Sequence, residues 1–197
     1  MEEKNLTGQE SLQLINRMIH EAKGYYYENG MAALVYGFTV FGCSILSFMM
    51  DRRVIDLPFI PFYVLVPVFF VQGWIQYQQD KKKKAKTFTD EAIDFVWMGF
   101  FLSVIVCLSA LWAGFGYIII SVILILIGFA CFLTGMLSKF RFHIYTSFLC
   151  WLIAIFSFFI NNENNYLLLA TAAVFTWIIP GFILKAKFKE VQKAEKE

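Results

Sequence analysis

Long stretches without charged side chains dominate the pattern of this chain. Four stretches of 21 to 23 residues contain no Asp, Glu, Lys or Arg: residues 29–50, 57–79, 142–162 and 164–184. Each matches the roughly 20 residues that a helix needs to cross a bilayer. Residues 95–138 are also uncharged and are long enough for two such helices, with a predicted turn at the AGFG of residues 113–116. The pattern therefore predicts six membrane-spanning helices, at about residues 31–50, 58–78, 93–112, 117–138, 142–160 and 165–184.

Helices fit these stretches better than the strands of a membrane barrel. Lipid offers the backbone no hydrogen-bond partner, so a spanning segment must be a helix or part of a closed barrel. Barrel strands are shorter and alternate apolar with polar residues. The composition agrees, because 59% of the residues are hydrophobic and 16% are charged, against about 45–50% and 25% in soluble domains. We therefore expect an all-α integral membrane protein.

The predicted spans show a weak internal repeat. Each even-numbered span carries a glycine shortly before a basic exit: Gly73, Gly135 and Gly181. Each odd-numbered span carries an aromatic residue close to a small residue and a Phe: Tyr36, Trp97 and Tyr145. This arrangement predicts three helical hairpins in series, although Gly and aromatic residues also recur near membrane interfaces without any repeat. Small residues let helices approach closely, so five glycines are expected on helix–helix contacts: Gly37, Gly42, Gly99, Gly128 and Gly135.

All four prolines fall inside the predicted spans, and two of them lie beyond the opening turn of their span. Pro67 lies in the middle of the second span and predicts a kink, because proline lacks the N–H of an interior helix bond and crowds the preceding turn. Pro180 precedes Gly181 near the end of the sixth span and predicts a bend or a loosened turn. All three residues are therefore predicted helix breaks.

The distribution of basic residues predicts the orientation. With six spans, both termini and the loops after spans two and four lie on one side and hold 15 of the 17 Lys and Arg residues. Arg52 and Arg53 lie on the other side. Basic residues favour the cytoplasmic side, so we expect both termini in the cytoplasm and the chain in the inner (plasma) membrane. The polar start of the chain has no apolar signal region, so the first span is expected to direct insertion.

An amphipathic stretch precedes the first span, and residues 1–30 are expected to form a cytoplasmic amphipathic helix, the leading helix. Apolar residues recur there at helical spacing and form what we name the apolar stripe: Leu12, Ile15, Ile19 and Tyr26. The stretch is nearly neutral, whereas helices that lie on anionic membranes are rich in Lys and Arg. We therefore expect the stripe to contact the helical bundle, a second copy in a homo-oligomer or a cytosolic protein, with a position in the lipid interface as the alternative.

Basic residues flank the spans on the same predicted side. Lys81, Lys82, Lys83 and Lys84 follow the second span and are expected at the membrane surface, where each contributes about 1 kcal/mol of attraction to anionic lipid. Aromatic residues that stack on bases are not interleaved with them, so direct binding of nucleic acid is not expected. Residues 186–197 are expected to form a charged cytoplasmic tail.

Residues suited to catalysis are not evident in the sequence. Apart from Asp94 at the edge of the third span, no predicted span contains an ionisable carboxylate or amine, and such groups within a membrane usually mark proton relays or ion pathways. The sequence contains neither a phosphate-binding loop nor a metal-ligand set of His, Cys, Asp and Glu. We therefore expect no catalytic residue, no cofactor and no metal, and the four cysteines are expected to pack as small apolar side chains.

Amides and hydroxyls are the polar side chains within the spans. They are expected to form hydrogen bonds between helices, worth roughly 0.6–2 kcal/mol each. The alternative is that they line a polar cavity open to the cytoplasm. The set contains seven residues: Gln72, Gln76, Thr134, Ser138, Ser147, Thr171 and Thr176.

Several motifs resemble a family of small six-span bacterial inner-membrane proteins. They are ESLQLINRMIHEAK at residues 10–23, FLTG…KF at residues 132–140, CW at residues 150–151 and WIIPG at residues 177–181. The family has no assigned activity, so the resemblance adds no catalytic or binding residue. It implies that the leading helix and the Pro-Gly break are family features. Members are often encoded beside a small winged-helix transcription regulator, which implies a sensory or regulatory partner.

Two functions remain open from the sequence. The first is a non-enzymatic membrane module that works through its cytoplasmic face, with the leading helix as its contact element. The second is a small, oligomeric permease or channel built around the second and sixth spans. A continuous polar cavity would favour transport, and a dry core would favour the module.

Overall fold

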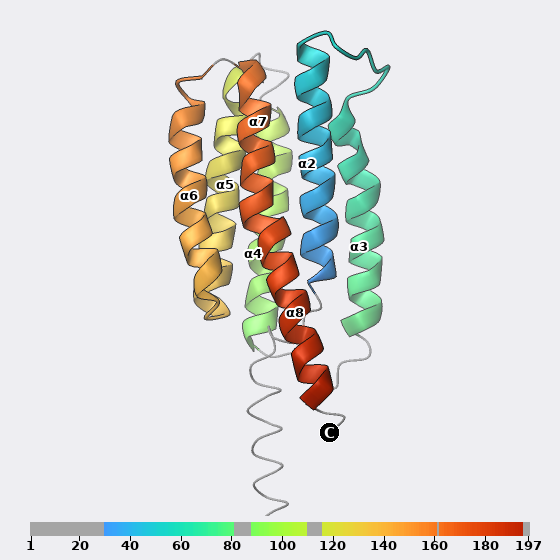
Figure 1. Ribbon diagram of the computed structural model, residues 1–197, viewed down its shortest axis with the longest axis vertical. Helices are drawn as coiled ribbons and strands as arrows, with labels where there is room; N and C mark the ends of the chain where they lie inside the picture. The colour runs from blue at the N-terminus through green and yellow to red at the C-terminus, as the bar shows by residue number, and fades with distance from the viewer. Residues whose placement is uncertain (1–29, 81–87, 110–115, 161, 195–197) are drawn as a thin grey trace, which may run out of the picture.

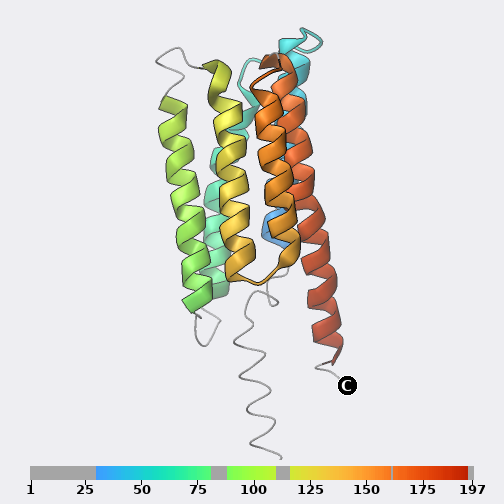
Figure 2. The same cartoon turned by 90° about the vertical axis from the view of Figure 1, so that its left-hand side faces the viewer.

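The computed structural model describes residues 30–80, 88–109, 116–160 and 162–194, which are helical over most of their length and contain no strand. The helices lie side by side with their long axes roughly parallel (Figures 1 and 2). They are α2 (Met31–Asp51), α3 (Leu65–Asp80), α4 (Phe88–Ser109), α5 (Gly116–Leu137), α6 (Arg141–Ser157), α7 (Asn162–Ala173) and α8 (Ile179–Ala194). The 3-10 turn η2 (Pro61–Val64) leads into α3, and the π-helical turn η3 (Val174–Ile178) joins α7 to α8.

Four of the described helices have the length and hydropathy of membrane-spanning segments. They are Met31–Asp51, Phe88–Ser109, Ile118–Leu137 and Asn164–Glu190. Two more, Pro61–Ile75 and Arg141–Ser157, are apolar but shorter. Large apolar side chains cover the outside, and Phe70 and Val106 are each 69% exposed. Soluble proteins rarely expose apolar patches of this extent, so the all-helical chain is suited to lipid.

Helices α5 and α6 form the most extensively packed pair, an antiparallel hairpin (Figure 2). A Cβ atom on Gly135 would lie 2.9 Å from Cγ1 of Ile144, so only the absence of a side chain permits this approach. Farther from the turn between α5 and α6, the indole of Trp151 lies against Gly128 and donates a hydrogen bond to the carbonyl oxygen of Ile125 at 3.2 Å. The pair is therefore held by small residues that admit bulky ones, as expected for packing in lipid.

A second antiparallel contact joins α2 to the continuous rod of α7, η3 and α8 (Figure 1). A Cβ atom on Gly37 would lie 2.9 Å from Cβ of Trp177 and 2.8 Å from Cγ1 of Ile178. Small side chains continue this contact toward the other end, where Ser44 on α2 and Ala172 on α7 are both completely buried. The buried core lies between these two contacts and draws residues from five of the helices.

Helix α4 lies at the edge of the bundle. Its backbone packs mainly on α5, and 11% of its apolar window is buried, against 50% for the windows of Ile118–Leu137 and Asn164–Glu190. Aromatic rings connect it to other helices: the ring centroids of Phe69 and Phe101 lie 4.7 Å apart, and those of Trp97 and Trp177 lie 6.3 Å apart. Ring contacts of this kind add about 0.5–1.5 kcal/mol each, and they attach α4 where backbone contact is sparse.

The predicted glycine contacts are partly confirmed. Gly37, Gly128 and Gly135 lie where a Cβ atom would collide with a neighbouring helix. The prediction is wrong for Gly42 and Gly99, around which a Cβ atom would meet nothing within 4 Å. Gly42 follows Gly37 by five residues, which turns it about 140° around the helix and away from the contact. The hairpin repeat stays a prediction. Its three glycines differ in their surroundings: a Cβ atom on Gly135 or Gly181 would meet a neighbouring helix, whereas one on Gly73 would meet nothing within 4 Å.

Two helices extend past the predicted spans. The third span was expected to begin at residue 93, but α4 begins at Phe88 and includes Asp90 and Glu91 in its first turn, where the helix dipole favours carboxylates. The sixth was expected to end at residue 184, but α8 continues to Ala194. Most of the predicted charged tail is therefore helical.

Candidate functional site

The rod that begins as α7 and ends as α8 departs from α-helical geometry in its middle. The π-helical turn Val174–Ile178 ends two residues before Pro180, whose missing N–H and crowded ring disfavour a regular turn before it. The Thr176 hydroxyl lies inside the π turn and donates a hydrogen bond to the Ala172 carbonyl oxygen at 2.8 Å. π-Helical turns inside helices occur frequently at functional sites. The π turn η3 and the start of α8 are therefore the candidate site.

Gly181 follows the π turn and packs directly on α2. A Cβ atom on Gly181 would lie 2.8 Å from Cγ of Leu34 and 3.2 Å from the carbonyl oxygen of Gly30. Conversely, a Cβ atom on Gly30 would collide with the carbonyl oxygen of Gly181 and would lie 3.1 Å from both Cβ of Leu184 and the backbone nitrogen of Lys185. The two glycines therefore face each other, and only glycine at both positions allows this contact.

Gly30 also sets the path by which the chain joins the bundle. It is the N-cap residue of α2 and has a left-handed backbone with φ of 65°, a conformation that other residues adopt at a cost of roughly 1–2 kcal/mol. Its carbonyl oxygen accepts the first α2 hydrogen bond from the Leu34 backbone nitrogen at 3.1 Å. We name Gly30, Leu34, Gly181 and Leu184 the Gly30–Gly181 junction; Leu34 is 6% exposed and Leu184 is 2% exposed.

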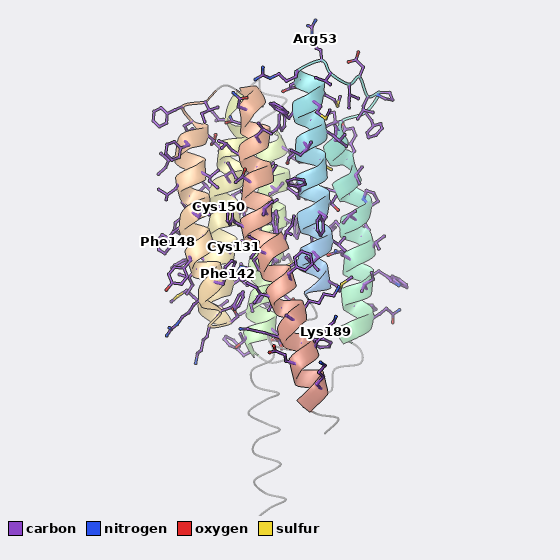
Figure 3. All side chains as sticks on the ribbon, in the orientation of Figure 1. Arg53, Cys131, Phe142, Phe148, Cys150 and Lys189 are labelled. Carbon is purple, nitrogen blue, oxygen red and sulfur yellow. The ribbon has the colours of Figure 1, made fainter. Side chains whose placement is uncertain are left out.

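The junction lies at the basic end of the bundle. Figure 3 shows Lys189 on the projecting part of α8, whereas Arg53 lies at the opposite end. The turn between α5 and α6 lies at the Lys189 end as well, and Lys187 of α8 reaches it: its Nζ lies 5.2 Å from the centroid of the Phe140 ring, a cation–π distance. The start of α2, the distorted helix and the basic residues of α8 therefore share one end.

Several predicted site residues lie outside the described part of the chain. These are the apolar stripe (Leu12, Ile15, Ile19 and Tyr26) and the lysine cluster (Lys81, Lys82, Lys83 and Lys84). The predicted mid-span kink at Pro67 needs correction, because Pro67 is the third residue of α3, which runs unbroken from Leu65 to Asp80 after the 3-10 turn. Near a helix start, the N–H that proline lacks has little or no intrahelical role.

The polar side chains of the spans mostly bond to their own helices. Thr171, Ser138 and Ser147 each donate a hydrogen bond to a carbonyl oxygen three or four residues earlier in the same helix. The prediction that they join helices is therefore wrong for these residues and for Thr176. Hydroxyls within helices commonly find this local acceptor, which sequence spacing does not reveal.

Gln72 does join two helices, as expected. Its amide nitrogen donates a hydrogen bond to the carbonyl oxygen of Ala32 on α2 at 3.3 Å. The side chain of Gln76 lies outside the described residues. Thr134 is 1% exposed and Ser147 is completely buried, so neither lines an open cavity.

Two contacts, one at the junction and one elsewhere in the bundle, were not anticipated from the sequence. One is the approach of Gly30 to Gly181 across about 150 residues of chain; Gly181 was predicted as a local helix break, which did not identify Gly30 as its partner. The second is a buried hydrogen bond between the hydroxyls of Ser157 and Ser121 at 2.6 Å, which joins α6 to α5. Two serines in apolar runs carry no signal that pairs them.

The side chains described around the junction make packing contacts and backbone hydrogen bonds. Among the described residues, no group of three or more His, Cys, Asp or Glu residues is arranged to hold a metal ion. The thiols of Cys43 and Cys150 donate to backbone carbonyl oxygens of Pro61 and Leu124, at 3.2 and 3.3 Å. What the junction can do is mechanical: it ties the start of α2 to a helix that is already distorted.

A comparison of this chain with protein-family models, curated proteins and solved structures finds no match. The resemblance to small six-span bacterial proteins therefore stays a prediction, and an argument for function has to start from the junction itself.

Proposed function

We propose that this chain is a six-span protein of the bacterial inner membrane that acts, without enzymatic chemistry, as an interaction or regulatory module at its cytoplasmic face. Four helices have the length and hydropathy for crossing. The 3-10 turn η2 and α3 together cover residues 61–80, close to the roughly 20 residues that a bilayer requires. Helix α6, at 17 residues, matches a bilayer that thins slightly around it, at a modest cost.

The charges at the two ends support the proposed orientation. The end that holds the junction carries Lys139, Arg141, Lys185, Lys187 and Lys189, whereas Arg52 and Arg53 lie at the opposite end. An excess of Lys and Arg in short loops favours the cytoplasmic side. We therefore place the junction, and with it both termini, in the cytoplasm.

This orientation predicts opposite labelling of two introduced cysteines. In intact cells, a membrane-impermeant thiol reagent should label Asn161→Cys but leave Glu2→Cys unlabelled until the cells are opened. The native cysteines are buried or half-buried, and the unaltered chain serves as the blank. Labelling of Glu2→Cys from outside intact cells would overturn the orientation.

The observation that carries the proposed function is the contact between Gly30 and Gly181. The leading segment, residues 1–29, joins the bundle at Gly30, so a movement of this segment at Gly30 acts on the start of α2 and on Gly181 of α8, which follows the π turn. Fully burying a large aliphatic side chain is worth roughly 1.5–3 kcal/mol, so the apolar stripe of the leading segment requires an apolar surface. The segment carries more Glu than Lys and Arg residues, so it has no charge attraction to anionic lipid, and protein is the better-matched surface. The hydroxyl residues Thr134 and Ser147 are buried and line no open cavity, so they give no support to the alternative of a permease or channel.

The module predicts that the apolar stripe is needed for contact with protein. Changing Ile15→Ser together with Ile19→Ser should leave the bundle inserted but should speed chymotryptic cleavage at residues 25–27 or remove proteins that co-purify after cross-linking. Gln13→Ser with Asn16→Ser, on the polar face, is the matched control. If the stripe variant behaves like this control in both measurements, the stripe does not pack on protein and the proposed function fails.

A further inference from the structure

Helix α8 extends well past the start of α2. Gly30, just before α2, already lies against Gly181, Leu184 and Lys185. Helix α8 nevertheless continues to Ala194, nine residues further, or about 14 Å of helix. Figure 1 shows this part of α8 projecting beyond the ends of the other helices. We name residues 186–194 the α8 overhang; α2 has no residue left to pack beside it.

The α8 overhang carries one aromatic side chain among mostly charged and polar residues. Phe188 lies within it and is half-buried, although the α2 helix ends before reaching this level. Most of the stability of a helix in water comes from packing its apolar face. An overhang of two and a half turns therefore gains from a second helix at its side.

Charge identifies the leading segment as a suitable partner. Lys185 and the overhang carry four lysines and one acidic residue, Glu190. The leading segment carries five Glu and three Lys or Arg residues, and the two acidic residues nearest to Gly30 are Glu21 and Glu28. Opposite net charges on two adjacent helices favour their association, by up to about 1 kcal/mol per exposed pair. The excess of lysines over acidic residues favours an acidic partner for this part of α8.

The antiparallel register gives the position of each residue. Along α2, Gly37 meets Trp177 and Ile178, and Gly30 meets Gly181 through Lys185. A step toward the N-terminus along α2 therefore corresponds to a step toward the C-terminus along η3 and α8. The left-handed Gly30 ends this register, but a Cβ atom on Gly30 would lie 3.1 Å from the Lys185 backbone nitrogen. Glu28 is two residues from Gly30, so a segment that runs on along α8 brings Glu28 within reach of Lys185. Glu21 then comes near the last turn of α8, which contains Lys193.

We infer that residues 19–28 dock antiparallel on the α8 overhang, with Glu28 beside Lys185 and Glu21 beside Lys189 and Lys193. The inference rests on the proposed role of the leading segment as a protein-packed helix, and it names the surface that the segment occupies. Ile19 and Tyr26 of the apolar stripe then face α8. A partner protein that takes this part of the stripe has to displace it from α8, so docking on α8 and binding of a partner exclude each other.

Charge reversal and its rescue test this docking in lipid nanodiscs, with the rate of chymotryptic cleavage at residues 25–27 as the readout. The first variant combines Glu21→Lys with Glu28→Lys, and the second combines Lys185→Glu with Lys189→Glu. Each should raise the rate about twofold to fivefold, as expected for the loss of exposed ion pairs. The chain with all four changes should return to the rate of the unaltered chain, which excludes misfolding as the cause.

Two outcomes would overturn the inference. In one, the control Lys82→Glu with Lys84→Glu speeds cleavage while the α8 variant does not, which would place the segment on the loop after α3. In the other, the α8 variant has an effect only in nanodiscs that contain anionic lipid and the fourfold change gives no rescue, which would assign these lysines to lipid headgroups. Either result leaves the proposed function standing if Ile15→Ser with Ile19→Ser still frees the segment; if that variant has no effect either, both proposals fail.

Discussion

Replacing Gly37 by Leu is expected to destabilise the bundle more than any surface change. A Cβ atom there would lie 2.8 Å from Cγ1 of Ile178, 2.9 Å from Cβ of Trp177 and 3.1 Å from the Ile178 backbone nitrogen. These atoms belong to the backbone or to its immediate neighbours, so they move only if α2 separates from the π turn. Overpacking of this kind costs typically 1–3 kcal/mol and occasionally more.

The same helix offers a matched control in Gly42. A Cβ atom on Gly42 would meet nothing within 4 Å, and Leu forms helix more readily than Gly by up to about 1 kcal/mol. Thermal unfolding in one detergent should therefore show a clearly lower midpoint for Gly37→Leu and an unchanged or higher one for Gly42→Leu. Equal midpoints for the two variants would contradict the packing of α2 on η3.

Replacing Gly181 by Leu should have an effect of similar size at the junction. Its Cβ would lie 2.8 and 2.9 Å from two carbons of the buried Leu34 side chain and 3.2 Å from the Gly30 carbonyl oxygen. Leu34 has little room to withdraw, because it is 6% exposed, so the start of α2 has to move; the cost is again about 1–3 kcal/mol.

Gly73, the glycine at the corresponding place in the predicted repeat, is the control for Gly181. A Cβ atom on Gly73 would meet nothing within 4 Å, so Gly73→Leu should leave the unfolding midpoint unchanged or raised. If Gly181→Leu were as stable as Gly73→Leu in the same detergent, the contact between α8 and the start of α2 would not hold the bundle together.

Hydropathy was sufficient to predict the class of fold. The uncharged runs predicted a chain of apolar helices, and the structure has four of membrane length among its described residues. The runs predicted helix ends poorly, because charged residues next to an apolar run also form helix: α4 takes in Asp90 and Glu91, and α8 takes in Lys185 and the lysines after it.

The contacts of individual residues were harder to predict. The presence of glycine in a span does not reveal which way it faces, and Gly37 and Gly42 differ by their rotation about one helix axis. The hydroxyl of Thr176 was expected to reach another helix, but it bonds to the carbonyl oxygen of Ala172 in its own turn. The pairing of Gly30 with Gly181 depends on how α2 and α8 pack, which local sequence does not encode.

The central claim is that the Gly30–Gly181 junction couples α8 to the leading segment, and cleavage of residues 25–27 by chymotrypsin tests it most directly. The rate should be compared in lipid nanodiscs at a temperature where all variants are folded. Gly181→Leu should be cleaved severalfold faster than the unaltered chain, whereas Gly73→Leu should be unchanged. Gly128→Leu, which disturbs Trp151 in the α5–α6 contact instead, controls for lost stability alone and should also be unchanged. An unchanged rate in Gly181→Leu, or an equal increase in Gly128→Leu, would contradict the coupling.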